Sequence, residues 1–259
     1  MATRPVFVPD TSLNKFVIEE EISFKWFPGY SLTQKQKSIE SLHRAALAQG
    51  IAPVLEISSK SSDSLGVHLS AFNLKLTHPD GIRISVESAY QGSKVFSNGG
   101  PFKDFFSLSG REIKKDKRLY NSGELIAFQF GAERWPLQPL TAFYDWLYLI
   151  ALVQNPDLSK PLLKFSAFSD IAFNPKKSFS CQARSAALFV SLTRLNQIET
   201  AVRSKDDFLK VLRPFEYQVS NQVSEAVQEE LFGEYAKPKK PSKKRKRRLT
   251  TKSTTLPSS

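Results

Sequence analysis

The sequence predicts an α+β fold that is predominantly helical, with a few short strands. Three observations support this prediction. Several segments repeat apolar residues at helical spacing, and short runs rich in β-branched and aromatic residues separate them. No internal repeat and no long Gly/Ser/Pro linker divides the first 235 residues. We therefore predict one domain over residues 1–235 and a tail over residues 236–259.

The order of elements follows from local signals. Residues 16–29 mix β-branched and aromatic side chains, which favours irregular or short-stranded structure. A helix should follow, capped by Thr33 and ended by Gly50, and residues 53–59 should form a short strand. The apolar residues of that helix recur at helical spacing: Ile39, Leu42 and Ala46.

The second half of the chain is richer in helix signals. The Pro, Asp and Gly of residues 78–81 predict a turn before a helix over residues 86–97, which the glycines at 99 and 100 should end. Ser109 and Glu112 form a capping-box pattern at the start of a basic helix ending near Gly123. A strand over residues 124–130 should precede four helices. These are predicted at residues 141–153, 181–196, 205–212 and 221–232.

Composition is that of a globular protein with a basic tail. The chain has 259 residues, 41% of them hydrophobic, which is long enough to bury a sizeable core. The formal charge of +12 is concentrated in ten basic residues between Lys237 and Lys252, so the rest of the chain is nearly neutral. The tail lacks aromatic residues and should stay disordered.

Several classes of protein are excluded on sequence grounds. The first ten residues lack the pattern of a secretory signal, which predicts a cytoplasmic protein. The longest apolar stretch, residues 140–153, is shorter than the ~20 residues of a membrane span. The single Cys181 forms no intramolecular disulfide and is expected in the core. His43 and His68 lack metal-ligand spacing, and no glycine-rich phosphate loop is present, so we expect neither a metal nor a cofactor.

The most informative chemistry lies in the helix predicted over residues 86–97. On a helix, Glu87, Gln91 and Lys94 would share one stripe, so an acid, an amide and an amine would line one pocket. The alternative is a solvent-facing stripe on an amphipathic helix whose opposite face, with Val86 and Tyr90, packs inward.

The segment from Leu69 to Phe96 resembles the core of the NADAR family of N-glycosidases. The matching pattern is a Ser/Asn/Phe/Tyr cluster, an Asp-Gly turn and a Val-Glu-x-x-x-Gln-x-x-Lys helix. The similarity extends over about residues 65 to 195, where Trp135 and Asp170 occupy family-like positions. It departs from the pattern at residues 70–73, which read Ser-Ala-Phe-Asn, at Ser88, and at residues 172–173. These departures imply a ligand base different from that of the riboflavin-intermediate hydrolases in the family.

The N-terminal region and residues 143–148 most resemble the NADAR proteins paired with DarT-type DNA ADP-ribosyltransferase toxins, which implies an antitoxin. The resemblance also implies site roles. Glu87 would act as the acid or charge stabiliser, Lys94 as a nucleophile, and Asp170 would orient water or ribose hydroxyls. Trp135 would stack on a base or pack in the core. The remaining ligand-binding candidates come from the matched motif: Ser70, Phe72, Asn73 and Gln91.

A run of basic residues is the candidate for binding the pyrophosphate of ADP-ribose. It comprises Arg111, Lys114, Lys115, Lys117 and Arg118, with Arg118 as the chosen ligand, and the alternative is a solvated helix face. The leading hypothesis is a DNA ADP-ribosyl glycohydrolase that releases ADP-ribose from a modified base, guanine by resemblance, with the cognate toxin as a further partner. The rivals are an N-glycosidase of a small nucleotide and a non-catalytic ADP-ribose or nucleic-acid binding module.

Overall fold

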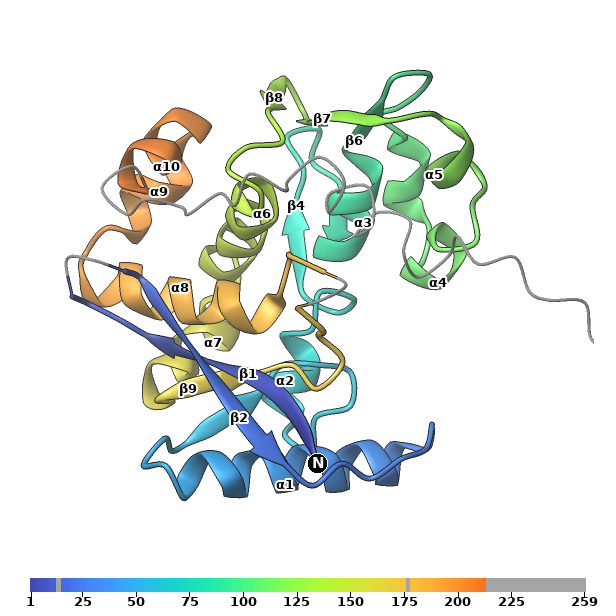
Figure 1. The fold of residues 1–259 in the computed structure, drawn as a ribbon. Coiled ribbons are helices and arrows are strands. Elements are labelled where there is room, and N and C mark those ends of the chain that lie inside the picture. Colours follow the sequence, from blue (N-terminus) through green and yellow to red (C-terminus); the bar gives the residue numbers. More distant parts are fainter. Residues whose placement is uncertain (13–14, 176–177, 213–259) are drawn as a thin grey trace, which may run out of the picture.

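The computed structural model describes residues 1–12, 15–175 and 178–212. Within them, three small sheets and their helices share one large apolar core and one smaller one (Figure 1). The predicted helix over residues 221–232 and the predicted tail over residues 236–259 lie outside the described residues. The fold is α+β as expected, but nine strands in the described part give the strands a larger share than the predicted few.

The largest sheet has four strands in the order β2-β1-β9-β3. Their bounds are Ala2–Pro9 for β1, Val17–Phe24 for β2, Val54–Glu56 for β3 and Ala167–Ser169 for β9. β1 pairs antiparallel with both β2 and β9, whereas β3 runs parallel to β9.

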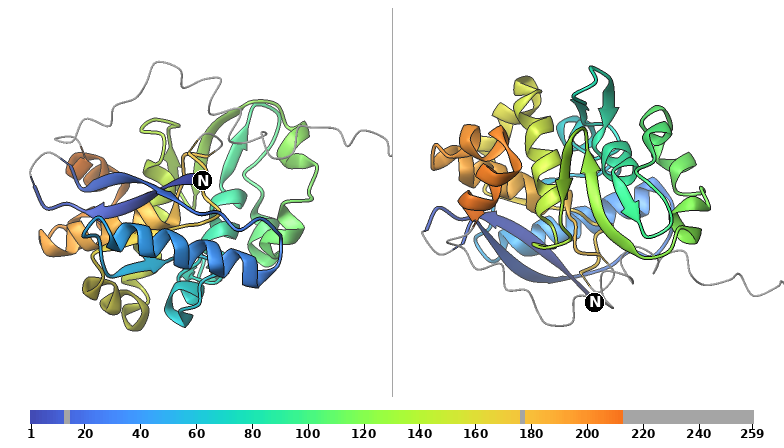
Figure 2. Two further views of the ribbon diagram at one scale, coloured as in Figure 1. Left: turned by 60° about the horizontal axis from the view of Figure 1, so that its bottom comes forward. Right: turned by 90° about the horizontal axis from the view of Figure 1, so that it is seen from above.

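Helices lie on both sides of this sheet (Figures 1 and 2). Alternate side chains of β1 face opposite sides, as the strand period of two requires. Val6 belongs to the apolar cluster of α1 (Leu32–Leu47), and Phe7 belongs to the cluster of α8 (Gln182–Arg194). Helix α1 confirms the predicted helix, although its cap is Ser31 rather than Thr33.

Helix α6 (Ala142–Val153) is the centre of the larger core. Nearly all of its side chains are buried, because it packs against α8, against α3 (Val86–Gly92) and against α9 (Ile198–Arg203). Helix α10 (Lys205–Leu212) follows α9. The predicted helices at residues 141–153, 181–196 and 205–212 are therefore confirmed.

The predicted helix over residues 86–97 is too long. Helix α3 ends at Gly92, and Lys94–Phe96 forms strand β6, which pairs with β7 (Leu125–Phe130). The chain turns at Gly92 because the N–H of Phe102 donates to its carbonyl, and a Cβ there would lie 2.6 Å from the Phe106 ring. Tertiary packing thus overrides the helical spacing that the sequence suggested.

Short elements complete the frame. The predicted turn at residues 78–81 joins β4 (Lys75–Thr77) to β5 (Arg83–Ser85), and β8 (Glu133–Trp135) extends the β6-β7 pair. The capping box at Ser109 is present, but the expected basic helix is broken into α4 (Gly110–Ile113) and α5 (Arg118–Asn121). The other short helices are α2 (Ser64–His68), η1 (Lys103–Ser107), α7 (Pro156–Ser159) and η2 (Lys160–Lys164). Among the described residues, no helix is long and apolar enough to cross a membrane.

Candidate active site

Glu87 stands in the first turn of α3 and is 9% exposed. Its backbone N–H donates to the Ala71 carbonyl over 2.9 Å, and Gln91 Nε2 donates to Glu87 Oε1 over 3.2 Å. Gly110 lies close by, because a Cβ there would lie 2.7 Å from the Phe72 ring and 3.2 Å from Glu87 Cγ. Glu87, Gln91 and Phe72 therefore meet on one side of α3.

Lys94 does not lie on α3, so the predicted helical stripe of Glu87, Gln91 and Lys94 is wrong. The residue is the first of β6, where it pairs with Phe128 of β7, and it is 5% exposed. Its ammonium group nevertheless returns to the helix, with Nζ 5.0 Å from the centre of the Tyr90 ring. The strand thus brings the amine to the face of an aromatic residue of α3.

Asp170 follows β9 directly and is 9% exposed. Its carboxylate accepts hydrogen bonds from the Ala172 N–H over 2.9 Å and from Gln182 Nε2 over 3.0 Å. Burial raises the pKa of Asp170 from an ordinary 3.8 to about 6, although these hydrogen bonds lower it. At neutral pH the group is therefore a buried anion.

Gln182 joins the Asp170 segment to the Glu87 segment. Its Nε2 also donates to the Ile57 carbonyl, and its Oε1 accepts from the Ala71 N–H over 2.7 Å. Since the carbonyl of Ala71 accepts from the Glu87 N–H, one chain of hydrogen bonds runs from Asp170 through Gln182 and Ala71 to Glu87. The segments of Glu87 and Asp170, which are 170 − 87 = 83 residues apart in the sequence, are held together in this way.

Tyr90 of α3 and Tyr144 of α6 form an aromatic pair, in a T-shaped contact with their ring centres 5.2 Å apart. Lys94 lies over the Tyr90 ring. Burial raises the pKa of the Tyr144 phenol well above its ordinary value, and the charges of Glu87 and Asp170 raise it further. The amine therefore lies at the Tyr90 ring, and both carboxyl groups are near enough to act electrostatically on Tyr144.

A third buried carboxyl group, that of Glu56 in β3, is hydrogen-bonded to the residues on either side of Asp170. Its Oε1 accepts from Ser58 Oγ and from the Ile171 N–H, and Ser169 Oγ donates to its Oε2 over 2.6 Å. Burial first, and then the charge of Asp170, raise the pKa of Glu56 from an ordinary 4.5 to about 8. At neutral pH Asp170 is thus ionised while Glu56 keeps its proton.

His43 of α1 extends this network toward the sheet. Its Nε2 lies 2.9 Å from Ser169 Oγ. Burial lowers the pKa of His43 from 6.5 to about 4, so the ring is neutral at physiological pH. In the described residues no group of three His, Cys, Asp or Glu side chains is arranged to hold a metal ion.

Three further residues were predicted to bind the ligand, namely Ser70, Asn73 and Trp135. Ser70 is fully buried, and the side chain of Asn73 donates to the Val67 carbonyl at the end of α2. Trp135 is 1% exposed and contacts Phe143 and Trp146. The core alternative for Trp135 is therefore the one that the structure favours over stacking on a base.

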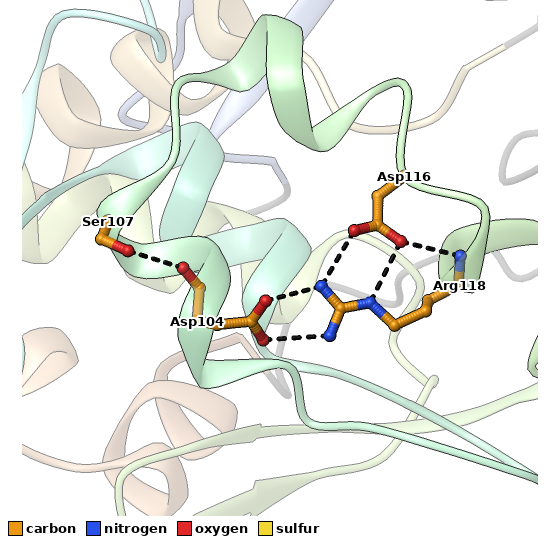
Figure 3. A network of polar contacts seen from close by, with 4 residues as sticks. All are labelled: Asp104, Ser107, Asp116 and Arg118. Atoms are coloured by element: carbon orange, nitrogen blue, oxygen red, sulfur yellow. Dashed lines mark hydrogen bonds and ion pairs between the residues drawn. The ribbon is translucent and has the colours of Figure 1, made fainter.

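Arg118 is also held by the protein itself (Figure 3). Its guanidinium donates to both carboxylate oxygens of Asp104 and to Asp116, and it lies 4.9 Å from the Phe102 ring centre. Because two carboxylates already offset its charge, Arg118 is better explained as the ion-paired link between η1 and α5 than as a pyrophosphate ligand.

The model of one protein family, described as the DarT1-associated NADAR antitoxin, matches residues 2–222. The chain belongs to this family. No curated protein matches the sequence. The family match spans every element from β1 to α10, including the segments that carry Glu87, Lys94 and Asp170.

Sequence reasoning missed three residues of this NADAR antitoxin's candidate site: Glu56, Tyr144 and Gln182. Tyr144 and Gln182 had a signal, since each is a polar group in a helix whose other positions are mostly buried. Such groups need a partner in the core or a ligand. Glu56 had a weaker signal, as an acid between the apolar residues Leu55 and Ile57 of a short strand.

Proposed function

We propose that this antitoxin is a DNA ADP-ribosyl glycohydrolase. It hydrolyses the N-glycosidic bond between ADP-ribose and a modified nucleobase, guanine by its resemblance to the toxin-paired members of the family. In doing so it reverses the modification made by the toxin. ADP-ribose and the restored DNA base are the products.

One observation carries the proposal. Two carboxyl groups that act electrostatically on Tyr144 and one amine that lies over the Tyr90 ring come from separate segments, and each of the three is more than nine-tenths buried. Cleavage of an N-glycosidic bond passes through an oxocarbenium-like state, which a nearby carboxylate stabilises. Burying charged groups is costly unless they are paired or used in binding and chemistry, so their convergence favours an enzyme over a passive scaffold.

In the proposed reaction Glu87 donates a proton to the leaving base nitrogen as its bond to ribose C1″ breaks. The neutral amine of Lys94 attacks C1″ and forms a new C–N bond. The ring oxygen then leaves C1″ with a proton, which gives an open-chain iminium between Lys94 and the sugar. Water adds to this carbon and releases the amine together with ADP-ribose. Asp170 orients the water or the ribose hydroxyls.

The basic tail supports a polymeric anion as substrate. Its ten cations stand in a segment without acidic residues, which suits contact with DNA phosphates through counterion release. A small nucleotide substrate gives such a segment no role in binding. A single assay, described next, distinguishes modified DNA from a small nucleotide as the substrate.

The test incubates the protein with oligonucleotides that carry ADP-ribose on a defined base, and measures free ADP-ribose by mass spectrometry. We expect release from the guanine-modified strand. Borohydride added during turnover should reduce the iminium and leave an adduct the size of ADP-ribose on the peptide that contains Lys94. Release only from a free nucleotide supports the small-substrate rival, and binding without release supports the non-catalytic module.

Two variants divide the roles. Glu87→Gln keeps the size of the side chain and removes the acid, so the protein should fold normally and lose nearly all turnover. Lys94→Arg keeps the charge but offers no neutral nucleophile, so turnover and adduct should both disappear while substrate still binds. Normal turnover by Lys94→Arg without any adduct in the wild type would limit Lys94 to a positioning charge.

A further inference from the structure

Tyr144 is a buried phenol whose hydroxyl makes no hydrogen bond with the described residues. It projects from α6 and is 6% exposed. Its ring is fixed by the T-shaped contact with Tyr90 and by a stacked contact with Tyr148, whose ring centre is 6.3 Å away. The hydroxyl is not one of the fully buried polar atoms that lack a partner, so the ring of Tyr144 is buried while its hydroxyl stays accessible to a ligand.

Tyr148, one turn further along α6, provides the contrast. It is fully buried, and its hydroxyl donates to the Leu69 carbonyl over 2.6 Å. The two tyrosines share a helix face, a neighbourhood and a ring orientation within 22°. The Tyr148 hydroxyl thus bonds α6 to the loop after α2, whereas the Tyr144 hydroxyl makes no such hydrogen bond with the described residues.

The surroundings of Tyr144 indicate what its hydroxyl meets. The charges of Glu87 and Asp170, from α3 and from the end of β9, both act on the phenol. Burial first, and then the charge of neighbouring groups, raises the pKa of Tyr144 well above 10, so the group remains a neutral O–H donor at any physiological pH. The Tyr144 hydroxyl is a donor, and the carboxyl groups of Glu87 and Asp170 offer acceptor oxygens. This combination matches a ligand that has both hydroxyl donors and oxygen acceptors.

We propose that the Tyr144 hydroxyl is a ligand-binding group that, with Glu87 and Asp170, recognises the vicinal diol of a ribose. The sugar hydroxyls donate to Asp170 and to one carboxyl oxygen of Glu87, whose other oxygen holds the proton for the leaving base, and Tyr144 donates to one of the sugar oxygens. This inference rests on the proposed function, because it assigns the group to the ribose next to the bond that is cleaved. A site built in this way rejects a sugar or nucleotide that lacks the diol, since its buried polar groups then stay unpaired.

The test compares Tyr144→Phe with Tyr148→Phe as a matched control. Each variant removes one hydroxyl from the same helix and keeps the ring. Affinities for ADP-ribose and for ADP, which lacks the second ribose, are measured by calorimetry, and KM is measured on the ADP-ribosylated oligonucleotide. Thermal unfolding is followed for each protein.

We expect Tyr144→Phe to weaken ADP-ribose binding about tenfold, to raise KM similarly and to leave ADP binding unchanged, because only the contact to the second ribose is lost. Its Tm should equal or exceed that of the wild type, since no hydrogen bond within the protein is removed. Tyr148→Phe should lower the Tm and leave both affinities unchanged, because it leaves the Leu69 carbonyl unpaired.

The outcomes separate the two proposals. A wild-type protein that neither binds ADP-ribose nor cleaves the oligonucleotide overturns the proposed function and this inference with it. An active wild type whose Tyr144→Phe variant keeps normal KM and ADP-ribose affinity overturns the inference alone. Equal weakening of ADP and ADP-ribose would place the hydroxyl at the adenosine end and would also refute the diol assignment.

Discussion

Glu56→Gln should change how the stability of the domain depends on pH. Glutamine has the size of a protonated glutamate, and it can keep the hydrogen bonds to Ser58, Ser169 and the Ile171 N–H. Because Glu56 in the folded protein has its pKa raised to about 8, the wild type already carries the neutral form at pH 7. The substitution therefore removes only the ability to ionise.

The size of the effect follows from the shift in pKa. An acid whose pKa is raised by folding stabilises the folded state below its unfolded value of 4.5, and this contribution is lost as the pH rises toward about 8. Between those values the free energy of unfolding falls by about 1.4 kcal/mol per pH unit. From pH 7 to pH 8 the loss is about 1 kcal/mol, because Glu56 begins to ionise in the folded state as well.

Other buried groups change the slope at lower pH. Folding lowers the pKa of His43 from 6.5 to about 4, so His43 makes stability rise as the pH increases between these two values. Folding raises the pKa of Asp170 from 3.8 to about 6, so Asp170 makes stability fall as the pH increases between these two values. The window from pH 7 to 8 lies above both. The difference between wild type and variant in this window isolates Glu56.

The assay is urea unfolding of both proteins at pH 6, 7 and 8, with Glu124→Gln as a control at an exposed position. The wild type should lose about 1 kcal/mol relative to Glu56→Gln between pH 7 and 8, and the control should follow the wild type. Parallel stability curves for wild type and Glu56→Gln would refute the reasoning, and so would a wild type that gains stability in this window.

Two further predictions concern the frame and the tail. Asp145→Ala should destabilise the domain by about 3 kcal/mol in urea unfolding, because it removes the fully buried carboxylate that lies 2.7 Å from the Arg184 guanidinium. A loss below about 1 kcal/mol would mean that the pair acts like a surface ion pair. Truncation after Ala236 should weaken DNA binding and make the binding affinity depend less on salt, because ten cations are removed. Turnover on a saturating short substrate should not change. Unchanged DNA binding at low salt would mean that the tail only improves solubility.

The long-range part of the fold was beyond sequence reasoning. Helices with many apolar residues, such as α6 and α8, were predicted nearly to the residue because their pattern is local. Strand β1 was missed, since Pro5 and Pro9 argue against a strand. On the side of β9 neither proline has to donate a hydrogen bond, because β9 pairs with β1 only at Val6 and Phe7.

The candidate site was predicted in its residues better than in its geometry. Spacing placed Lys94 on a helix with Glu87, but Gly92 ends the helix and a strand delivers the amine instead. Periodicity describes a segment in isolation, and the close approach of Phe106 to Gly92 is a property of the folded core. For Trp135 and Arg118 the structure favours core packing and ion pairing over ligand binding, and the Phe208 and Asp104 partners that support this were not visible from local spacing.

The pair of Glu56 and Asp170 explains how the site can present one buried anion. If Glu56 and Asp170 were both ionised, their repulsion would add to the cost of burial. Glu56 keeps its proton instead, and Asp170, which receives hydrogen bonds from Gln182 and the Ala172 N–H, carries the charge. An ionised Asp170 accepts hydrogen bonds and cannot donate a proton at neutral pH. It therefore suits the orientation of water or sugar hydroxyls, which leaves protonation of the leaving base to Glu87 in the proposed reaction.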